Sequence, residues 1–140
     1  MNNDLISARG RLSRGGCTCV LCRGGDLYTS SERGVAPLLD FLDRGGWSGF
    51  SAADKVVGKA TAFLYVLLGV RAVYAPVMSS AAIRILQRRG IDCVCDTEVD
   101  AIFNRTRTGL CPMENAVRDI DDPQLALEAI RNTLARLSLQ

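Results

Sequence analysis

Two lysines and a carboxylate stand close together where a short apolar stretch ends and a helix is predicted to begin. They belong to the run Asp54-Lys55-Val56-Val57-Gly58-Lys59-Ala60. If Lys55 opens the helix, Lys55 and Lys59 share one helix face, a turn apart. The N–H groups of a first helical turn lack partners within the helix, so this positively charged helix start predicts a site for an anion such as phosphate or carboxylate. The alternative is that Asp54 only caps the helix and both lysines are solvated.

A cysteine lies at the start of a second candidate segment, Gly109-Leu110-Cys111-Pro112-Met113-Glu114. Proline favours the first helical position, which makes Cys111 the N-cap, where the helix dipole favours a thiolate. Glu114 then falls at the third helical position, where its carboxylate can accept a hydrogen bond from the cap backbone. A thiolate at Cys111 could act as a nucleophile or a redox-sensitive group. The alternative is a buried, inert thiol.

Lys59 and Glu114 within these segments, and three polar residues outside them, are further candidates for ligand binding. Asn104 and Arg105 lie on a polar loop shortly before Cys111, and both side chains could hydrogen-bond an anionic or planar ligand. The alternative for this pair is a solvent-exposed loop. Ser79 follows a buried strand and is a natural N-cap for the next helix.

The chain has no histidine and six cysteines, which narrows its possible chemistry. The commonest general base and the usual nitrogen ligand of zinc are therefore missing. The spacing Cys17-x-Cys19-x-x-Cys22 could hold a metal or an iron–sulfur cluster. In an extended strand, however, Cys17 and Cys19 face one side and Cys22 the other, and Cys93 and Cys95 also fit packed strand positions. We expect no metal and no cofactor, with a metal or redox protein as the alternative.

The length and charge indicate one domain over residues 1–140, with residues 1–14 as a short N-terminal helix. The net charge is +2, from 17 basic and 15 acidic residues without a basic block, so nucleic-acid binding has no positive signal. The longest apolar stretch, residues 60–70, is shorter than the ~20 residues of a membrane span. No leader pattern opens the chain, and we expect a cytoplasmic protein.

Hydrophobic periodicity predicts helices that alternate with strands after an N-terminal hairpin. The links between them are short, which favours parallel strands joined by right-handed crossovers. The expected elements are a helix at 2–13, a hairpin at 17–22 and 27–29, a helix at 37–44, a strand at 47–53, a helix at 55–68, a strand at 70–78, a helix at 80–89, a strand at 91–95, short helices near 102 and 112, and a last helix from 123.

Together these motifs resemble a bacterial family known as domain of unknown function 1893, over residues 3 to 135. The resemblance rests on the 54–60 and 109–114 segments, Met78-Ser79, Asn104-Arg105 and the run Gly34-Val35-Ala36-Pro37-Leu38-Leu39. It implies a cytidine-deaminase-like fold, a three-layer α/β/α sandwich around a mixed five-stranded sheet. Zinc deaminases carry a His/Cys-x-Glu motif and a Pro-Cys-x-x-Cys motif at two helix starts. The matching positions here, Asp54-Lys55 and Met78-Ser79, lack those ligands.

The family fold implies a pocket at the carboxyl ends of the parallel strands, where Asp54, Lys55, Ser79 and Cys111 would converge. The leading hypothesis is a zinc-free pocket for a small anionic or nucleotide-like ligand, neutralised by Lys55 and Lys59. Cys111, Asp54 and Lys55 would be the catalytic residues if the protein is an enzyme. The alternatives are a non-catalytic ligand-binding or regulatory module and a redox or metal-binding protein that uses its cysteines. A homodimer through an exposed sheet edge is a further hypothesis.

Overall fold

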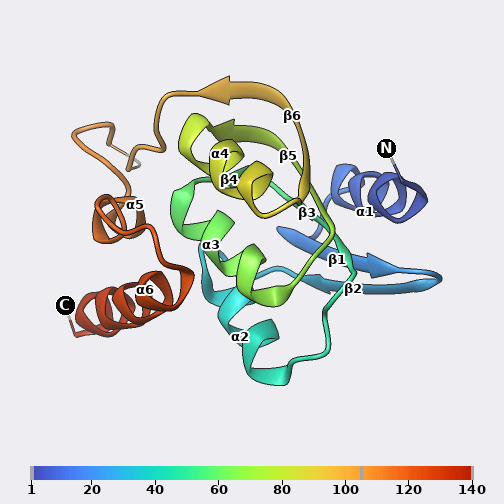
Figure 1. Cartoon of the computed structure of the whole chain (residues 1–140), viewed down its shortest axis with the longest axis horizontal. Coiled ribbons are helices and arrows are strands. Elements are labelled where there is room, and N and C mark those ends of the chain that lie inside the picture. Colours follow the sequence, from blue (N-terminus) through green and yellow to red (C-terminus); the bar gives the residue numbers. More distant parts are fainter. Residues whose placement is uncertain (1, 105, 140) are drawn as a thin grey trace.

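The computed structural model describes residues 2–104 and 106–139, which form a mixed α/β fold (Figure 1). The fold consists of one sheet with helices packed on both of its faces. In chain order its elements are α1 (Asn3–Ser13), β1 (Cys19–Arg23), β2 (Asp26–Ser30), α2 (Ala36–Arg44), β3 (Ser51–Asp54), β4 (Val56–Val57), α3 (Lys59–Leu68), β5 (Ala72–Ser79), α4 (Ser80–Arg88), β6 (Asp92–Val99), α5 (Pro112–Ala116) and α6 (Pro123–Ser138).

The sheet has one antiparallel end and one parallel end. Strand β1 pairs antiparallel with both β2 and β3, whereas β3, β4 and β6 all pair parallel with β5. Strand β6 pairs with β5 along almost its whole length, so β3 and β4 share the opposite edge of β5. The ladder on that edge stops between the pairs Ala53–Tyr74 and Val56–Val77 and resumes in the same register.

Pro76 explains why the sheet has six strands and not the five that we expected. It lies on β5 within the gap between β3 and β4, and proline has no N–H to donate to a neighbouring strand. The β5–β6 pairing also skips Pro76. One long strand beside β5 is therefore divided into β3 and β4, with Lys55 at the break. The expectation of five strands was wrong at this point.

Two hydrophobic cores hold the helices to the sheet. Helix α1 covers one face, where Leu5 and Leu12 pack against Val20 and Tyr74. The larger core lies on the opposite face, between the sheet and helices α2, α3 and α4, and Phe63 of α3 lies within it. Helix α6 packs beside α3 and α5, away from the sheet (Figure 1).

The helix predicted to begin at Lys55 begins four residues later, at Lys59, with Gly58 as its N-cap. Val56 and Val57 instead continue the sheet, because β-branched residues favour a strand and β5 offers them a partner. Lys55 therefore lies in the break between two strands and Lys59 in a helix. The prediction that Lys55 and Lys59 share one helix face was wrong.

The remaining local predictions have mixed outcomes. The N-terminal helix, the hairpin about Gly24-Gly25 and the helix opened by Pro112 are confirmed. The short helix predicted near residue 102 is wrong, because Phe103 forms a β-bridge with Leu110. The strand predicted at 91–95 extends further, to Val99.

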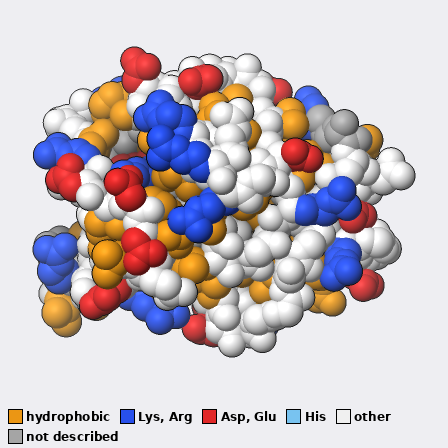
Figure 2. Space-filling view, viewed as in Figure 1, with side chains coloured by type: hydrophobic (Ala, Val, Ile, Leu, Met, Phe, Trp, Pro, Cys, Tyr) orange, Lys and Arg blue, Asp and Glu red, His pale blue; other side chains and the backbone are white. Residues whose placement is uncertain are grey.

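The surface and the helix lengths agree with the balanced composition. Basic and acidic side chains are interspersed with apolar ones across the face shown in Figure 2, without a single large field of one sign. Within the described residues, the helices are all too short or too polar to cross a membrane.

Candidate functional site

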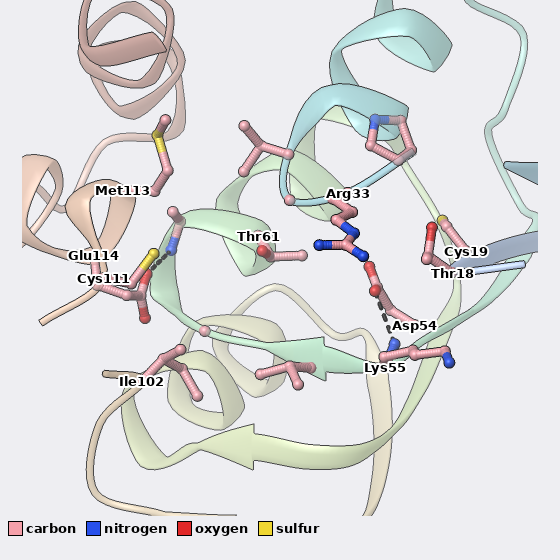
Figure 3. A pocket seen from close by; sticks show the side chains of 16 residues that line it. Thr18, Cys19, Arg33, Asp54, Lys55, Thr61, Ile102, Cys111, Met113 and Glu114 are labelled. Atoms are coloured by element: carbon pink, nitrogen blue, oxygen red, sulfur yellow. Dashed lines mark hydrogen bonds between the residues drawn. The ribbon is translucent and has the colours of Figure 1, made fainter. Parts of the chain in front are cut away.

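A cavity of about 490 Å³ opens where β3 ends, beside the first turn of α3. Its walls come from four parts of the chain: the start of β1, the approach to α2, the 54–61 segment and the region around α5 (Figure 3). We call it the Asp54 pocket. The residues that line it are Thr18, Cys19, Arg33, Gly34, Val35, Pro37, Asp54, Lys55, Val56, Gly58, Ala60, Thr61, Ile102, Cys111, Met113 and Glu114.

Asp54 is half-buried at the end of β3, and its carboxyl group lines the cavity. Its Oδ2 accepts a hydrogen bond of 2.7 Å from the hydroxyl of Tyr65, and its Oδ1 accepts one of 2.8 Å from the backbone N–H of Lys55. Burial raises the pKa of Asp54 to about 7, although these two hydrogen bonds act in the opposite direction. A carboxyl with this pKa can accept or release a proton near neutral pH.

Tyr65 connects Asp54 to a buried thiol. The Tyr65 hydroxyl donates to Asp54 and lies 3.4 Å from the Sγ of Cys19, so the Cys19 thiol donates to Tyr65 while Asp54 is ionised. Burial raises the pKa of Tyr65 and that of the Cys19 thiol, and the Asp54 charge raises both further. Cys19 therefore lines the pocket as a neutral thiol and is a poor nucleophile.

Two cationic side chains lie at the rim of the pocket. Lys55 and Arg33 are both exposed and both line the cavity, and Figure 3 shows Arg33 extending toward Asp54. The ion pairs found among the described residues lie elsewhere on the molecule. Both cations of the rim are therefore available to an anionic group of a ligand.

The first turn of α3 is capped by a side chain from α5. The Oε1 of Glu114 accepts a 2.7 Å hydrogen bond from the N–H of Lys59, and its Oε2 accepts a 2.8 Å bond from the N–H of Ala60. Gly58 makes this approach possible, because a Cβ at that position would overlap the Glu114 carboxyl. We predicted that Glu114 bonds back to its own helix start and that the α3 amides are free for an anion. Both predictions were wrong, because Glu114 occupies those amides.

The structure brings four of the predicted site residues together in one cavity: Asp54, Lys55, Cys111 and Glu114. Asp54 and Cys111 lie toward opposite sides of the close-up in Figure 3. Cys111 is the N-cap of α5, as predicted, and is half-buried.

Lys59, Ser79 and Asn104 lie outside the cavity lining. The Nζ of Lys59 donates to the carbonyl of Arg118 at 2.9 Å. Ser79 is buried and caps α4 by accepting from the N–H of Ala82, which confirms its predicted capping role. The side chain of Asn104 bonds within its own loop, to Thr108 and Thr106. Arg105 lies outside the described residues.

Sequence reasoning missed Arg33, Tyr65 and Cys19 as parts of the site. Tyr65 lies on the buried side of α3, where the sequence pattern matches an ordinary core position. Its hydroxyl needs a hydrogen-bond partner when buried, and this was the one sequence signal that Tyr65 contacts a polar group. Arg33 comes directly before the run Gly34-Val35-Ala36-Pro37-Leu38-Leu39, which was identified as a family motif. A charged residue adjacent to that motif was the signal that could have found it.

The N-terminal cysteines do not converge. Cys17 and Cys22 belong to the core under α1, whereas Cys19 belongs to the core on the opposite face. The prediction that Cys17 and Cys19 share one side was wrong, because the strand begins only at Cys19. Across residues 2–104 and 106–139, no group of three or more Cys, Asp or Glu side chains could hold a metal ion.

The fold and the pocket define a mixed α/β protein with a small-molecule-sized cavity at the end of its parallel strands. The family model described as "Domain of unknown function (DUF1893)" matches residues 7–134, so the chain belongs to this family. A solved crystal structure of a DUF1893 family protein from Thermotoga maritima has the same fold, with a TM-score of 0.82 and 23% sequence identity over 97% of this chain and 92% of that chain. A comparison with curated proteins found no match.

Proposed function

We propose that this protein binds a small anionic or nucleotide-like ligand in the Asp54 pocket, without zinc. The observation that carries the proposal is the combination of a near-neutral carboxyl on the pocket wall with two cations at its rim, Lys55 and Arg33. A carboxyl of raised pKa in a cleft is a common mark of a functional site.

The walls of the pocket fit such a ligand. A cavity of about 490 Å³ lies within the range of small-molecule sites. Val56, Ile102 and Met113 supply apolar surface for a flat ring, and Asp54 supplies a hydrogen-bonding group for a ring N–H or a hydroxyl. Arg33 and Lys55 suit a phosphate or carboxylate, because a guanidinium and an ammonium form charge-assisted hydrogen bonds with oxyanions.

The proposal includes a cytidine-deaminase-like sandwich that has lost the zinc site. It is supported by the mixed sheet with helices on both faces and by a pocket at the carboxyl end of β3. The chain contains no histidine, and the cysteines are free thiols, as is usual in the cytoplasm. Asp54 and Lys55 precede the start of α3 in this fold, and they offer a carboxylate and an ammonium at the end of the sheet where the family resemblance implies the pocket.

An enzyme that uses the same pocket is the second candidate, and the pKa of Asp54 favours it. A carboxyl that titrates near pH 7 suits general acid–base catalysis, and Tyr65 holds this one in place. Cys111 would be the nucleophile in such an enzyme. In a non-catalytic binding or regulatory module, the same groups would only bind the ligand.

A thermal-shift screen tests the binding proposal. Its library contains inorganic phosphate, nucleosides, nucleoside monophosphates and short carboxylic acids. A ligand at one hundred times its dissociation constant should stabilise the wild type by about 2.7 kcal/mol. Lys55→Ala and Arg33→Ala should each lose most of the shift produced by an anionic hit. Arg84→Ala is the matched control, because Arg84 is exposed on α4 and does not line the pocket.

Two results would overturn the proposal. One is a screen in which no compound raises the melting temperature of the wild type. The other is an anionic hit whose shift persists unchanged in the double variant Arg33→Ala/Lys55→Ala, because that ligand would bind elsewhere. Incubation of a hit with the protein, followed by mass spectrometry of the compound, then separates an enzyme from a binding module.

A further inference from the structure

One wall of the Asp54 pocket is formed by a segment that packs mainly against α6 and contacts α3 at only a few places. This wall segment, residues 110–118, includes α5 and contributes Cys111, Met113 and Glu114 to the lining. Figure 3 shows these side chains together on the side of the pocket away from Lys55. The position of the wall segment therefore sets the width of the pocket.

The Glu114 carboxylate is the main polar link between the wall segment and α3. Both of its oxygens are used, one by the N–H of Lys59 and the other by the N–H of Ala60. A second link joins the same place on α3 to the far end of α5, where the Nζ of Lys59 donates to the carbonyl of Arg118. Hydrogen bonds to an ionised carboxylate are stronger than those between neutral groups, so Glu114 dominates this contact.

Burial contributes little to holding α5 in place. None of its five residues is fully buried, and a helix of this length has no stability of its own in water. The apolar anchor is Val117, which follows α5 and is fully buried in the larger core. Met113 packs against the same core, and α5 packs against α6. The wall segment is thus anchored by Val117 and by α6, and it is held against α3 by Glu114.

Gly58 makes this contact specific. Its N-cap position has no side chain, so α3 has no capping group of its own, and the Glu114 carboxyl fills the space that a Cβ would need. When the Glu114 carboxylate leaves these amides, water can solvate both the carboxylate and the N–H groups. The free-energy cost of breaking and remaking this contact is therefore modest.

We infer that Glu114 is a latch: its carboxylate holds residues 110–118 against the start of α3, and its release lets the Glu114 side of this wall move away from α3, about the anchors at Val117 and α6, and open the Asp54 pocket. The inference rests on the proposed function only for the statement that the opening admits a ligand. Glu114 is a positioning residue in this scheme, because it acts through the placement of Cys111 and Met113.

Hydrogen–deuterium exchange of the free protein tests the latch. In Glu114→Ala, amides in peptides that cover residues 110–118 and the Lys59–Ala60 region should exchange at least ten-fold faster than in the wild type. Glu114→Gln should show a smaller increase at the same places, because its amide keeps one acceptor oxygen. Peptides from β5 should be unchanged, and so should all peptides of the control Glu128→Ala, whose side chain is exposed on α6.

The pattern of exchange separates a latch from other roles of Glu114. Unchanged exchange at residues 110–118 in both Glu114 variants would overturn the inference, because something other than Glu114 would then hold the wall. A uniform increase that reaches β5 in Glu114→Gln would also overturn it, because Glu114 would then support the whole fold. If Glu114→Ala does not fold, the exchange of Glu114→Gln is sufficient to decide between these outcomes. No ligand is used, so a failed ligand screen leaves this result unaffected.

Discussion

Replacing Asp54 with asparagine should make the stability of the protein less dependent on pH between 5 and 8. Burial raises the pKa of Asp54 from its ordinary 3.8 to about 7 in the folded state. Between these two values the folded protein keeps the Asp54 proton while the unfolded chain releases it. The folded state therefore binds more protons, and the stability supplied by this group is complete below pH 3.8 and is lost as the pH rises through 7.

The size of this effect follows from the two pKa values. Between the two pKa values, each rise of one pH unit lowers the free energy of unfolding by about 1.4 kcal/mol. The interval from pH 5 to pH 7 contains two such units. The wild type should therefore lose roughly 3 kcal/mol through Asp54 between pH 5 and pH 8. Asp54→Asn cannot lose it, since its side chain does not titrate. Asp54→Asn also alters the hydrogen bond to Tyr65. This alteration changes the free energy of unfolding by the same amount at every pH, so it leaves the pH slope unchanged.

Urea unfolding at pH 5, 6, 7 and 8 measures this slope. The protein has a single tryptophan, Trp47, which is only 7% exposed, so its fluorescence reports unfolding. The difference in unfolding free energy between Asp54→Asn and the wild type should grow in favour of the variant as the pH rises. Asp119→Asn is the control, because Asp119 is exposed, and its difference should stay flat. A flat difference for Asp54→Asn as well would refute the reasoning and remove the main support for proton transfer at Asp54.

Two other substitution or labelling experiments test the geometry of the pocket. Gly58→Ala should destabilise the protein by about 1–3 kcal/mol, because the new Cβ displaces the Glu114 carboxyl and crowds Ile102, which breaks two hydrogen bonds to helix amides. The control Gly10→Ala, with open space around the same added atom in α1, should stabilise by about 0.5–1 kcal/mol, and equal effects of the two changes in urea unfolding would contradict the Glu114 contact. Iodoacetamide followed by peptide mass mapping should label half-buried Cys111 well before buried Cys19, whose pKa is raised, whereas faster labelling of Cys19 would contradict the described pocket.

Local patterns predicted many of the elements and one part of the site. Ser79 was identified as a helix cap because a serine between a strand and a helix has a local role that spacing reveals. Cys111 was placed at the start of α5 because Pro112 follows it. The helix start near Lys55 was predicted wrongly, since apolar residues at 56, 57 and 60 fit a helical period as well as a strand followed by a helix.

The amino-acid sequence alone determined the absence of histidine chemistry, the α/β order of elements and the family to which the chain belongs. Only the tertiary structure decided what the candidate residues do. It turned Lys59 away from the pocket, placed Glu114 on the amides at the start of α3, and joined Asp54 to Tyr65 and Cys19. Sequence spacing reports neighbours along one element, whereas the pKa of a carboxyl and the partner of an amide depend on groups from distant elements that meet only in the folded protein.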